Sequence, residues 1–209
     1  IVLTPDYNPF IQAILKGIRQ ATDEFSPFGL KIDVKMLTTL EAAELISILN
    51  EMSINGYSGI AVFPIDDTQV KNKINQLVDE GIVVMTFNSR IDGIHDLCFL
   101  GQDHVQGGVA AGGLMGHLLP DGGEVGVIIS STSLSCHQCR LKGFQEKLAS
   151  RYPDLHIVDI KENQDRKDEA FKYTLEYCNR YPNLKGIYIT GGGIGGVGTR
   201  GDAYAQQAN

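Results

Sequence analysis

Two cysteines separated by two residues are the first pair in this sequence whose types and spacing suit chemistry. The segment Cys136-His137-Gln138-Cys139 opens a predicted helix, where the helix dipole would stabilise a thiolate as in CxxC oxidoreductases. The pair lies deep in the chain, however, and no other thioredoxin-like feature accompanies it. A structural zinc site needs four ligands, and only His137 joins the two thiols nearby. We therefore expect neither redox activity nor a metal here.

A run of glycines near the end of the sequence matches a cofactor-binding pattern. Gly191, Gly193 and Gly196 satisfy Gly-x-Gly-x-x-Gly directly after a predicted strand, as in the dinucleotide-binding fingerprint. That fingerprint usually stands in the first strand–helix unit, and an acidic residue follows about twenty positions later. Here the pattern follows the eighth predicted strand, and the sequence stops at Asn209. A cofactor-binding enzyme is therefore the weaker interpretation, and we expect no cofactor.

The other reactive residues form no catalytic constellation. The remaining histidines are scattered, and no Ser-His-Asp order or paired-carboxylate site stands out. The 209 residues are 43% hydrophobic with a formal net charge of −7, which is ordinary for a globular protein. An acidic balance opposes a grip on nucleic acid phosphates, which relies on clustered Lys and Arg. No apolar run approaches the ~20 residues of a membrane span. The sequence favours a binding protein with no catalytic and no metal-binding residues.

Short apolar runs alternate with longer segments of helical period, and these elements must position any site. Several runs are rich in Val, Ile and Phe without polar alternation, as expected for strands covered on both faces. Such alternation predicts a parallel sheet with right-handed crossovers. The predicted strands are Ile1–Leu3, Ile32–Met36, Gly59–Phe63, Val83–Phe87, Cys98–Leu100, Val125–Ile129, Ile157–Ile160 and Gly186–Ile189. The predicted helices are Pro9–Glu24, Leu40–Asn55, Thr68–Glu80, Val105–Leu118, Leu134–Arg151 and Lys167–Tyr181.

The alternation breaks once, after the strand Val83–Phe87. The connection Asn88–Leu97 is too short and too rich in Gly and Asp for a crossover helix, and a new strand–helix series then begins. We therefore predict an α/β fold of two doubly wound parallel-sheet lobes, with an N-terminal lobe over 1–101 and a C-terminal lobe over 102–209. The predicted hinge comprises Gly101, Gln102 and Asp103. In such sheets ligands lie outside the carboxyl ends of the strands, so we expect the ligand in an inter-lobe cleft.

Four local patterns point to one family. Asn8-Pro9-Phe10 follows the first strand, and Gly59–Asp67 joins a strand to a Pro-x-Asp-Asp exit. Gly81–Ser89 contains an apolar strand that ends in polar residues, and Arg140–Phe144 reads Arg-x-x-Gly-Phe at a helix start. In this order, the patterns resemble the type I periplasmic-binding-protein fold of sugar-binding proteins, in the form used by LacI-type regulators.

The resemblance implies a set of ligand contacts. Arg140 would be the second-lobe cation over the ligand, and a guanidinium can bind two adjacent hydroxyls or a carboxylate. Asn88 stands where many sugar binders have Asp, and an amide both donates and accepts, which suits a hydroxyl better than an anion. Because these and other positions depart from the usual residues, no particular sugar is predicted. The implied ligand-binding residues are Asn8, Phe10, Phe63, Asp66, Asn88, Ser89, Arg140 and Gln164.

Structural roles compete with binding roles at several of these positions. Asn8 can cap the helix that begins at Pro9, and Phe10 can be a core residue. Either Asp66 or Asp67 can be the N-cap of the helix from Thr68. Asn88 can be an ordinary turn residue, and Arg140 can pair with a surface carboxylate.

Two functions share this fold, so the fold alone does not choose between them. The first is the effector-binding domain of a LacI-family regulator, a cytoplasmic homodimer that binds a sugar-like ligand and passes lobe closure to a DNA-binding head. The alternative is the sugar receptor of an ABC transporter. The four cysteines fit a reducing compartment and favour the regulator, as does the likeness of Phe87-Asn88-Ser89 and Gly101-Gln102-Asp103 to LacI-type members.

The ends of the sequence also carry an expectation. The chain begins inside a predicted strand, so we expect that residues precede it. The resemblance implies further strands and helices that return to the first lobe, so we expect the C-terminal lobe to be truncated. Arg200–Asn209 does not resemble the helix that the family has at this place.

We predict that the 209-residue chain does not bind DNA by itself, because it is acidic and has no basic stripe. A mobility-shift assay at physiological salt should show no retarded band. Sequence-specific binding in that assay would contradict the prediction.

We also predict that Cys136 and Cys139 are thiols without a bound metal in the native protein, because no fourth ligand lies nearby in the sequence. Elemental analysis should find no stoichiometric zinc, and thiol titration after unfolding should detect both cysteines. A Cys136–Cys139 disulfide that controls binding would instead establish the redox interpretation.

Overall fold

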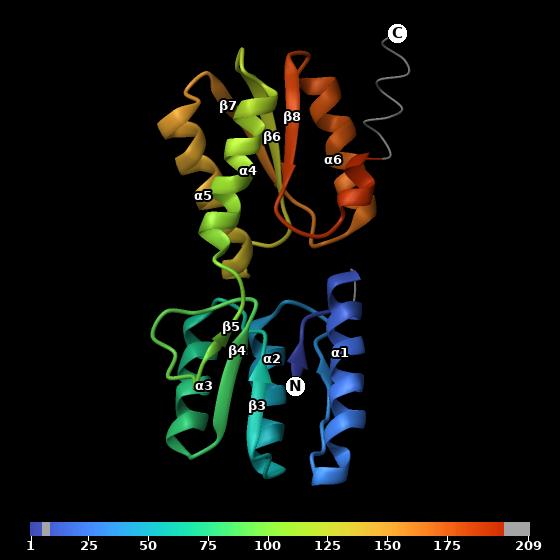
Figure 1. The fold of residues 1–209 in the computed structure, drawn as a ribbon, viewed down its shortest axis with the longest axis vertical. Coiled ribbons are helices and arrows are strands. Elements are labelled where there is room, and N and C mark those ends of the chain that lie inside the picture. The colour runs from blue at the N-terminus through green and yellow to red at the C-terminus, as the bar shows by residue number, and fades with distance from the viewer. Residues whose placement is uncertain (6–8, 199–209) are drawn as a thin grey trace. The chain divides into compact units, whose positions relative to one another are not determined.

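The computed structural model describes residues 1–5 and 9–198, which form two compact units (Figure 1). The first unit comprises Ile1–Gly101 together with Ser133–Ser135. The second comprises Gln102–Thr132 and the chain from Cys136 onward. Each unit is built on a parallel sheet of its own, as the alternation of strands and helices predicts.

The first unit contains a five-stranded parallel sheet in the order β2-β1-β3-β4-β5. Its strands are β1 (Val2–Leu3), β2 (Lys35–Met36), β3 (Gly59–Val62), β4 (Val83–Phe87) and β5 (Phe99–Leu100). Its helices are α1 (Pro9–Phe25), the short 3-10 helix η1 (Ser26–Phe28), α2 (Ala42–Ile54) and α3 (Thr68–Asp79). As predicted, β4 reaches β5 without a helix, and the loop hydrogen-bonds from Leu97 N to Val84 O at 2.7 Å.

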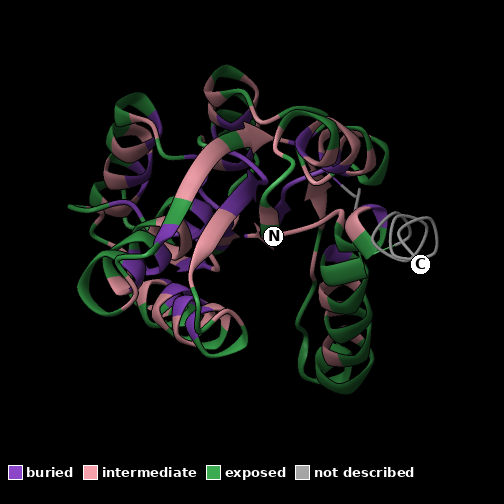
Figure 2. Cartoon of the chain, turned by 90° about the horizontal axis from the view of Figure 1, so that it is seen from above, coloured by how far each residue is buried: buried purple, intermediate pink, exposed green. Residues whose placement is uncertain are grey.

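The core of the first unit lies on alternate residues of its strands. Ile60, Val62 and Val84 are fully buried, whereas Gly59 and Val83 on the other face are exposed. Buried leucines, methionine, valine and isoleucine on α2 and α3 complete this core, and the two helices pack against each other. Figure 2 shows buried residues along the strands and on the inner sides of helices, with exposed residues on the outer helical faces.

Helix α1 is less buried than its apolar pattern predicts. Phe10, Ile14, Gly17 and Ile18 share one helical face, but Phe10 is 47% exposed and Ile14 and Ile18 are half-buried. Ile11 is the one buried residue of this helix. The predicted apolar stripe is therefore only partly covered by the described residues.

The second unit contains a three-stranded parallel sheet in the order β7-β6-β8. Its strands are β6 (Gly123–Ile129), β7 (Leu155–Glu162) and β8 (Leu184–Ile189). Its helices are α4 (His104–Leu118), α5 (Ser135–Arg151) and α6 (Lys167–Arg180). All eight predicted strands are present, and the predicted parallel α/β fold is confirmed.

Different helices pack against the two faces of this sheet. Val125 and Val127 of β6 pack with Phe144 and Leu148 of α5, and the apolar side of α4 joins the same cluster. The ring of Phe144 stacks on Tyr188 of β8 at 4.3 Å between centroids. Gly126 points to the other face, where a Cβ would lie 2.6 Å from the ring of Tyr177 in α6. Helices α4 and α5 therefore cover one face and α6 covers the other.

Helices α4 and α5 touch backbone to backbone through glycines. A Cβ on Gly108 would lie 2.0 Å from the carbonyl oxygen of Arg140, and a Cβ on Gly143 would lie 2.0 Å from that of Val105. Gly112 and Gly116 continue the contact one and two turns along α4, against Lys147 and Tyr152. No other residue type fits at Gly108 or Gly143 without separating the two helices.

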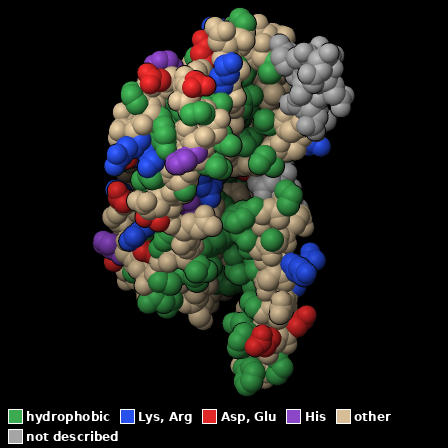
Figure 3. Space-filling model, turned by 45° about the horizontal axis from the view of Figure 1, so that its top comes forward, with side chains coloured by type: hydrophobic (Ala, Val, Ile, Leu, Met, Phe, Trp, Pro, Cys, Tyr) green, Lys and Arg blue, Asp and Glu red, His purple; other side chains and the backbone are tan. Residues whose placement is uncertain are grey.

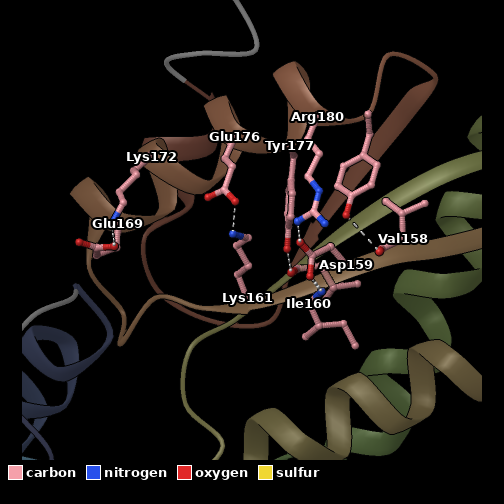
Figure 4. A network of polar contacts seen from close by, with 11 residues as sticks. Val158, Asp159, Ile160, Lys161, Glu169, Lys172, Glu176, Tyr177 and Arg180 are labelled. Carbon is pink, nitrogen blue, oxygen red and sulfur yellow. Dashed lines mark hydrogen bonds and ion pairs between the residues drawn. The ribbon is translucent and has the colours of Figure 1, made fainter.

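Helix α6 is tied to the sheet by side chains along its length (Figure 4). The Tyr177 hydroxyl donates to the Val127 carbonyl at 2.7 Å, inside the core. At the surface, Lys161 pairs with Glu176, and Arg180 lies 3.7 Å from Asp159. Exposed ion pairs contribute little to stability, about 0–1 kcal/mol each. The buried tyrosine therefore contributes more to holding the helix on the sheet than the ion pairs at its surface do.

None of the helices in the described part of the chain has the length and apolar character that a bilayer crossing requires.

Gly108→Ala should destabilise the protein, because the added methyl group would meet the main chain of Arg140. Overpacking of this kind typically costs about 1–3 kcal/mol. Gly107→Ala is the matched control on the same helix, since a Cβ there meets nothing within 4 Å. It should raise the free energy of unfolding by about 0.5–1 kcal/mol, the usual helix preference for Ala over Gly. Urea unfolding of both variants checks this. Equal effects would show that the α4–α5 contact is loose.

Candidate functional site

The carboxyl ends of β1, β3 and β4 lie side by side at one edge of the first sheet, because these parallel strands are neighbours. Five of the predicted binding residues follow these strands. Phe63 and Asp66 follow β3, and Asn88 and Ser89 follow β4. Phe10 is the second residue of α1, the helix after β1, and Asn8 lies outside the described residues. We call this set the first edge.

Asn88 is the most distinctive residue of the first edge. Its φ of 58° is left-handed, and its N–H donates to the Leu100 carbonyl at 2.9 Å. A non-glycine residue rarely adopts this conformation, and Asn does so at the lowest cost after Gly. Such strained positions concentrate at functional sites. The half-buried amide of Asn88 therefore stands where a ligand contact was predicted.

The other residues of the first edge differ in exposure. Phe63 is 3% exposed, and its ring lies 5.7 Å from that of Phe87, so it belongs to the core. Ser89 is also buried. Asp67 is the N-cap of α3, accepting from Gln69 N at 2.7 Å, and this leaves the exposed Asp66 without that structural role. The Asp66 N–H itself donates to the Ser133 carbonyl at 2.8 Å.

In the second unit, β6, β7 and β8 end together at a second edge. Three polar residues follow these strands and are buried, namely Ser130, Asn163 and Thr190. Within the described residues, Ser130 Oγ and Asn163 Oδ1 have no hydrogen-bond partner, so both retain a capacity to bind water or ligand. We call Ser130, Asn163 and Thr190 the second edge, together with the residues of α5 and of the neighbouring loops that contact them.

Arg140 joins the second edge from α5. Its Nη1 donates to the Thr190 carbonyl at 3.0 Å, and its side chain is half-buried. No carboxylate pairs with Arg140 among the ion pairs of the described residues. The surface ion pair that the sequence left open for Arg140 is therefore not found in the described part of the chain, and its ligand contact stays a prediction.

His137 lies one turn before Arg140 and is buried beside it. Its Nδ1 is 3.4 Å from Thr190 Oγ1, which also accepts from Ser130 N at 3.2 Å. Burial lowers the pKa of His137 to about 4, although the Asp165 carboxylate raises it, and the Arg140 cation lowers it further. The imidazole is therefore neutral at pH 7 and adds no second positive charge beside Arg140.

Gln164 lies in a left-handed turn after β7. Its φ is 53° and that of Asp165 is 59°, so with Asn88 these are the three non-glycine residues of positive φ in the described chain. The side-chain amide of Gln164 donates to Glu162 Oε1 at 2.6 Å, and Glu162 also accepts from Thr132 N at 3.0 Å. All three left-handed residues thus lie within three residues of a strand end, and two of them, Asn88 and Gln164, are predicted ligand contacts.

The glycine run after β8 is explained by packing. A Cβ on Gly191 would lie 2.1 Å from Ser130 Oγ, and one on Gly196 would lie 2.2 Å from the Lys167 carbonyl oxygen. Gly193 has a φ of 91° and fits against Asn163. These glycines allow the segment to approach the β7–α6 turn closely, which accounts for the pattern without a dinucleotide.

The predicted hinge residues are exposed where the two units join in sequence. A Cβ on Gly101 would overlap the Phe99 ring, and Asp103 caps α4 by accepting from Gln106 N at 3.0 Å. Their role as a hinge stays a prediction.

The cysteine motif takes part in packing. Cys136 is buried, Cys139 is half-buried, and no disulfide joins the four cysteines. Across the described residues, no group of three or more His, Cys, Asp or Glu side chains is arranged to hold a metal ion.

Several residues of the second edge were missed by the sequence analysis. Thr190, His137, Asn163 and Asp165 converge from two loops and one helix, and such distant contacts leave no local pattern. One signal was available, since Asn and Asp soon after a strand favour turns and tolerate the left-handed conformation.

Comparison with known proteins places this architecture. A family model described as a periplasmic binding protein domain matches residues 1–206. The D-ribose/D-allose-binding protein of Pseudomonas aeruginosa is 22% identical over 156 residues, which are 70% of this chain and 47% of that protein. This chain thus spans less than half the length of that relative.

Two solved structures are similar over nearly the whole chain. The sugar-binding protein of a sugar ABC transporter from Bacillus halodurans is 26% identical, with a TM-score of 0.77 over 98% of this chain and 70% of that one. The arabinose-binding protein AraP from Geobacillus stearothermophilus is 27% identical, with a TM-score of 0.72 over the same shares. By its family match over residues 1–206, this chain belongs to the periplasmic binding protein domain family.

Proposed function

We propose that this chain binds a small sugar or similar polyol as the solute receptor of an ABC transporter, and that the ligand contacts predicted at each edge take part in binding it. The observation that carries the proposal is that two residues predicted to contact the ligand have a strained, left-handed backbone conformation. Asn88 and Gln164 were selected from the sequence as ligand contacts, and both adopt left-handed conformations within two residues of a strand end. Backbone strain of this kind is retained where binding depends on it.

The chemistry of the two edges suits hydroxyl groups. The Asn88 amide both donates and accepts, and the Arg140 guanidinium uses one donor on Thr190 and keeps others for a ligand. The neutral His137 and the carboxylates of Glu162 and Asp165 limit the positive charge of the second edge. An uncharged polyol is therefore a better ligand than an anion.

The choice of a receptor over a regulator rests on the relatives. The sequence analysis put a LacI-type effector domain first, with a receptor as the alternative. The named relatives are a ribose- and allose-binding protein, a transporter's sugar-binding protein and an arabinose-binding protein, and these names support the receptor. On the face shown in Figure 3, acidic and basic side chains are interspersed without a continuous basic stripe, which agrees with the prediction that this chain does not bind DNA by itself and does not distinguish the two functions.

A regulator remains the second candidate, because the cysteines favour it. A cytoplasmic homodimer with a DNA-binding head would keep the four cysteines reduced, whereas a receptor outside the cytoplasm would expose Cys98 to oxidants. The coding sequence in front of Ile1 distinguishes the two. A helix-turn-helix there would establish the regulator, and a signal peptide or lipoprotein cysteine would establish the receptor.

Arg140→Ala should weaken sugar binding with little loss of stability, because the side chain lies at an edge. A hydrogen bond from a charged group contributes roughly 1.5–3 kcal/mol and tenfold in affinity is about 1.4 kcal/mol, so the expected loss is about ten- to a hundredfold. Asn88→Gly keeps the left-handed backbone and removes only the amide, so it should act in the same direction but less strongly.

Isothermal titration calorimetry with D-ribose, D-allose and arabinose measures these effects. Arg151→Ala is the matched control, since Arg151 is exposed at the end of the same helix. If the full-length protein that includes this chain binds none of a broad panel of sugars and polyols, the proposed function is wrong. If Arg140→Ala binds as tightly as wild type, Arg140 is structural.

A further inference from the structure

At the second edge, a turn and a neighbouring segment are joined by hydrogen bonds to the main chain of Gly192. The turn is Asn163–Arg166 after β7, and the segment is Thr190–Gly193 after β8. Asn163 Nδ2 donates to the Gly192 carbonyl at 3.0 Å, and Asp165 Oδ1 accepts from Gly192 N at 2.6 Å. Both main-chain polar groups of Gly192 are therefore held by side chains of this turn.

The fit between turn and segment leaves no spare room. A Cβ on Gly192 would lie 2.7 Å from Asp165 Oδ1, and one on Gly193 would lie 2.4 Å from Asn163 Nδ2. Asn163 is completely buried and also bonds the Arg166 carbonyl at 3.1 Å. The segment can therefore occupy only one position relative to the turn.

The same segment holds the guanidinium of Arg140. The Thr190 carbonyl, two residues before Gly192, accepts from Arg140 Nη1 at 3.0 Å. The Thr190 hydroxyl is fixed in turn by Ser130 N and lies beside His137. An acceptor can orient a guanidinium only if the acceptor itself is fixed, and the contacts at Gly192 and at the Thr190 hydroxyl fix it.

We propose that Asp165 is a positioning residue for Arg140, acting through the Gly192 N–H and the Thr190 carbonyl. This rests on the proposed function, in which Arg140 contacts the ligand. Asp165 itself is not assigned a ligand contact. Its role accounts for its left-handed φ of 59°, which is retained because the carboxylate reaches Gly192 N from that conformation.

A bond from a main-chain N–H to an ionised carboxylate is stronger and shorter than one between neutral groups. The 2.6 Å distance between Asp165 Oδ1 and Gly192 N agrees with such a bond. Its loss should leave Gly192 held by Asn163 through its carbonyl alone, so the chain after Thr190 should loosen and the Arg140 guanidinium should sample more orientations.

Two substitutions at Asp165 separate positioning from folding. Asp165→Gly removes the acceptor and tolerates the left-handed backbone, so the protein should remain folded. Asp165→Asn keeps an acceptor oxygen and also tolerates this conformation. We expect Asp165→Gly to weaken sugar binding roughly tenfold and Asp165→Asn by less than about threefold, since a bond to a neutral acceptor replaces one to a charged acceptor.

A double-mutant cycle tests whether the effect passes through Arg140. In the Arg140→Ala background, Asp165→Gly should change affinity by less than about twofold, because the group that it positions is gone. If the full tenfold loss persists in that background, Asp165 acts independently of Arg140 and the proposal is overturned.

A measurement without ligand keeps this proposal separate from the proposed function. ¹⁵N relaxation of the guanidinium Nε–H should show Arg140 ordered in the wild-type chain and mobile in Asp165→Gly, with the exposed Arg151 as the mobile reference. If Arg140 stays ordered in Asp165→Gly, the positioning role is wrong whatever the sugar results are. If Arg140 is released but no sugar binds the wild type, the positioning role stands and the function fails.

Discussion

The structure of the second unit depends on the backbone contact between α4 and α5. Gly108 on α4 lies against the carbonyl of Arg140, and Gly143 on α5 lies against the carbonyl of Val105. Because neither position has room for a side chain, the two helices cross at a fixed depth and rotation. Arg140 belongs to this crossing through its main chain and to the second edge through its side chain. The packing of α4 against α5 thus fixes the main-chain position from which the Arg140 side chain extends.

The parallel sheets supply the other half of the arrangement. In each unit the central strands end at a common edge, so residues far apart in sequence meet there without long loops. Ser130, Asn163 and Thr190 follow three different strands and meet at the second edge. The loops that carry them are short and hydrogen-bonded to neighbouring strand ends, for example from Gln164 N to the Ser130 carbonyl at 2.8 Å. The strand ends therefore fix the main chain from which the side-chain contacts of the second edge extend.

Much of this fold was predictable from sequence because its strands are short, apolar and regularly separated by amphipathic helices. The strand bounds were less accurate. β6 begins at Gly123 rather than Val125, and β7 begins at Leu155 rather than Ile157, because the pairing extends across Glu124 and His156, two polar residues that interrupt the apolar pattern. The 3-10 helix η1 was also missed, since a Pro after Ser26 indicates a turn as readily as a short helix.

The candidate site was predictable only in part. Asn88 and Arg140 stand in local motifs, and the structure places both at strand edges or beside them. Phe63 also stands in such a motif, yet its ring packs on Phe87, because the last residue of an apolar run lies in the core as readily as at its rim. The bonds of Asp165 and Asn163 to Gly192 join residues that are 27 and 29 positions apart, a separation at which sequence carries no pattern.

The left-handed turn at Gln164 sets a limit on how this protein can change. Glycine at that position would relieve the backbone, so selection for stability alone would favour it over glutamine. Glutamine at this position therefore carries a backbone cost, which its predicted ligand contact would explain, as is common where function needs strain. If that contact exists, selection for thermal stability and selection for ligand recognition act in opposite directions at this one residue.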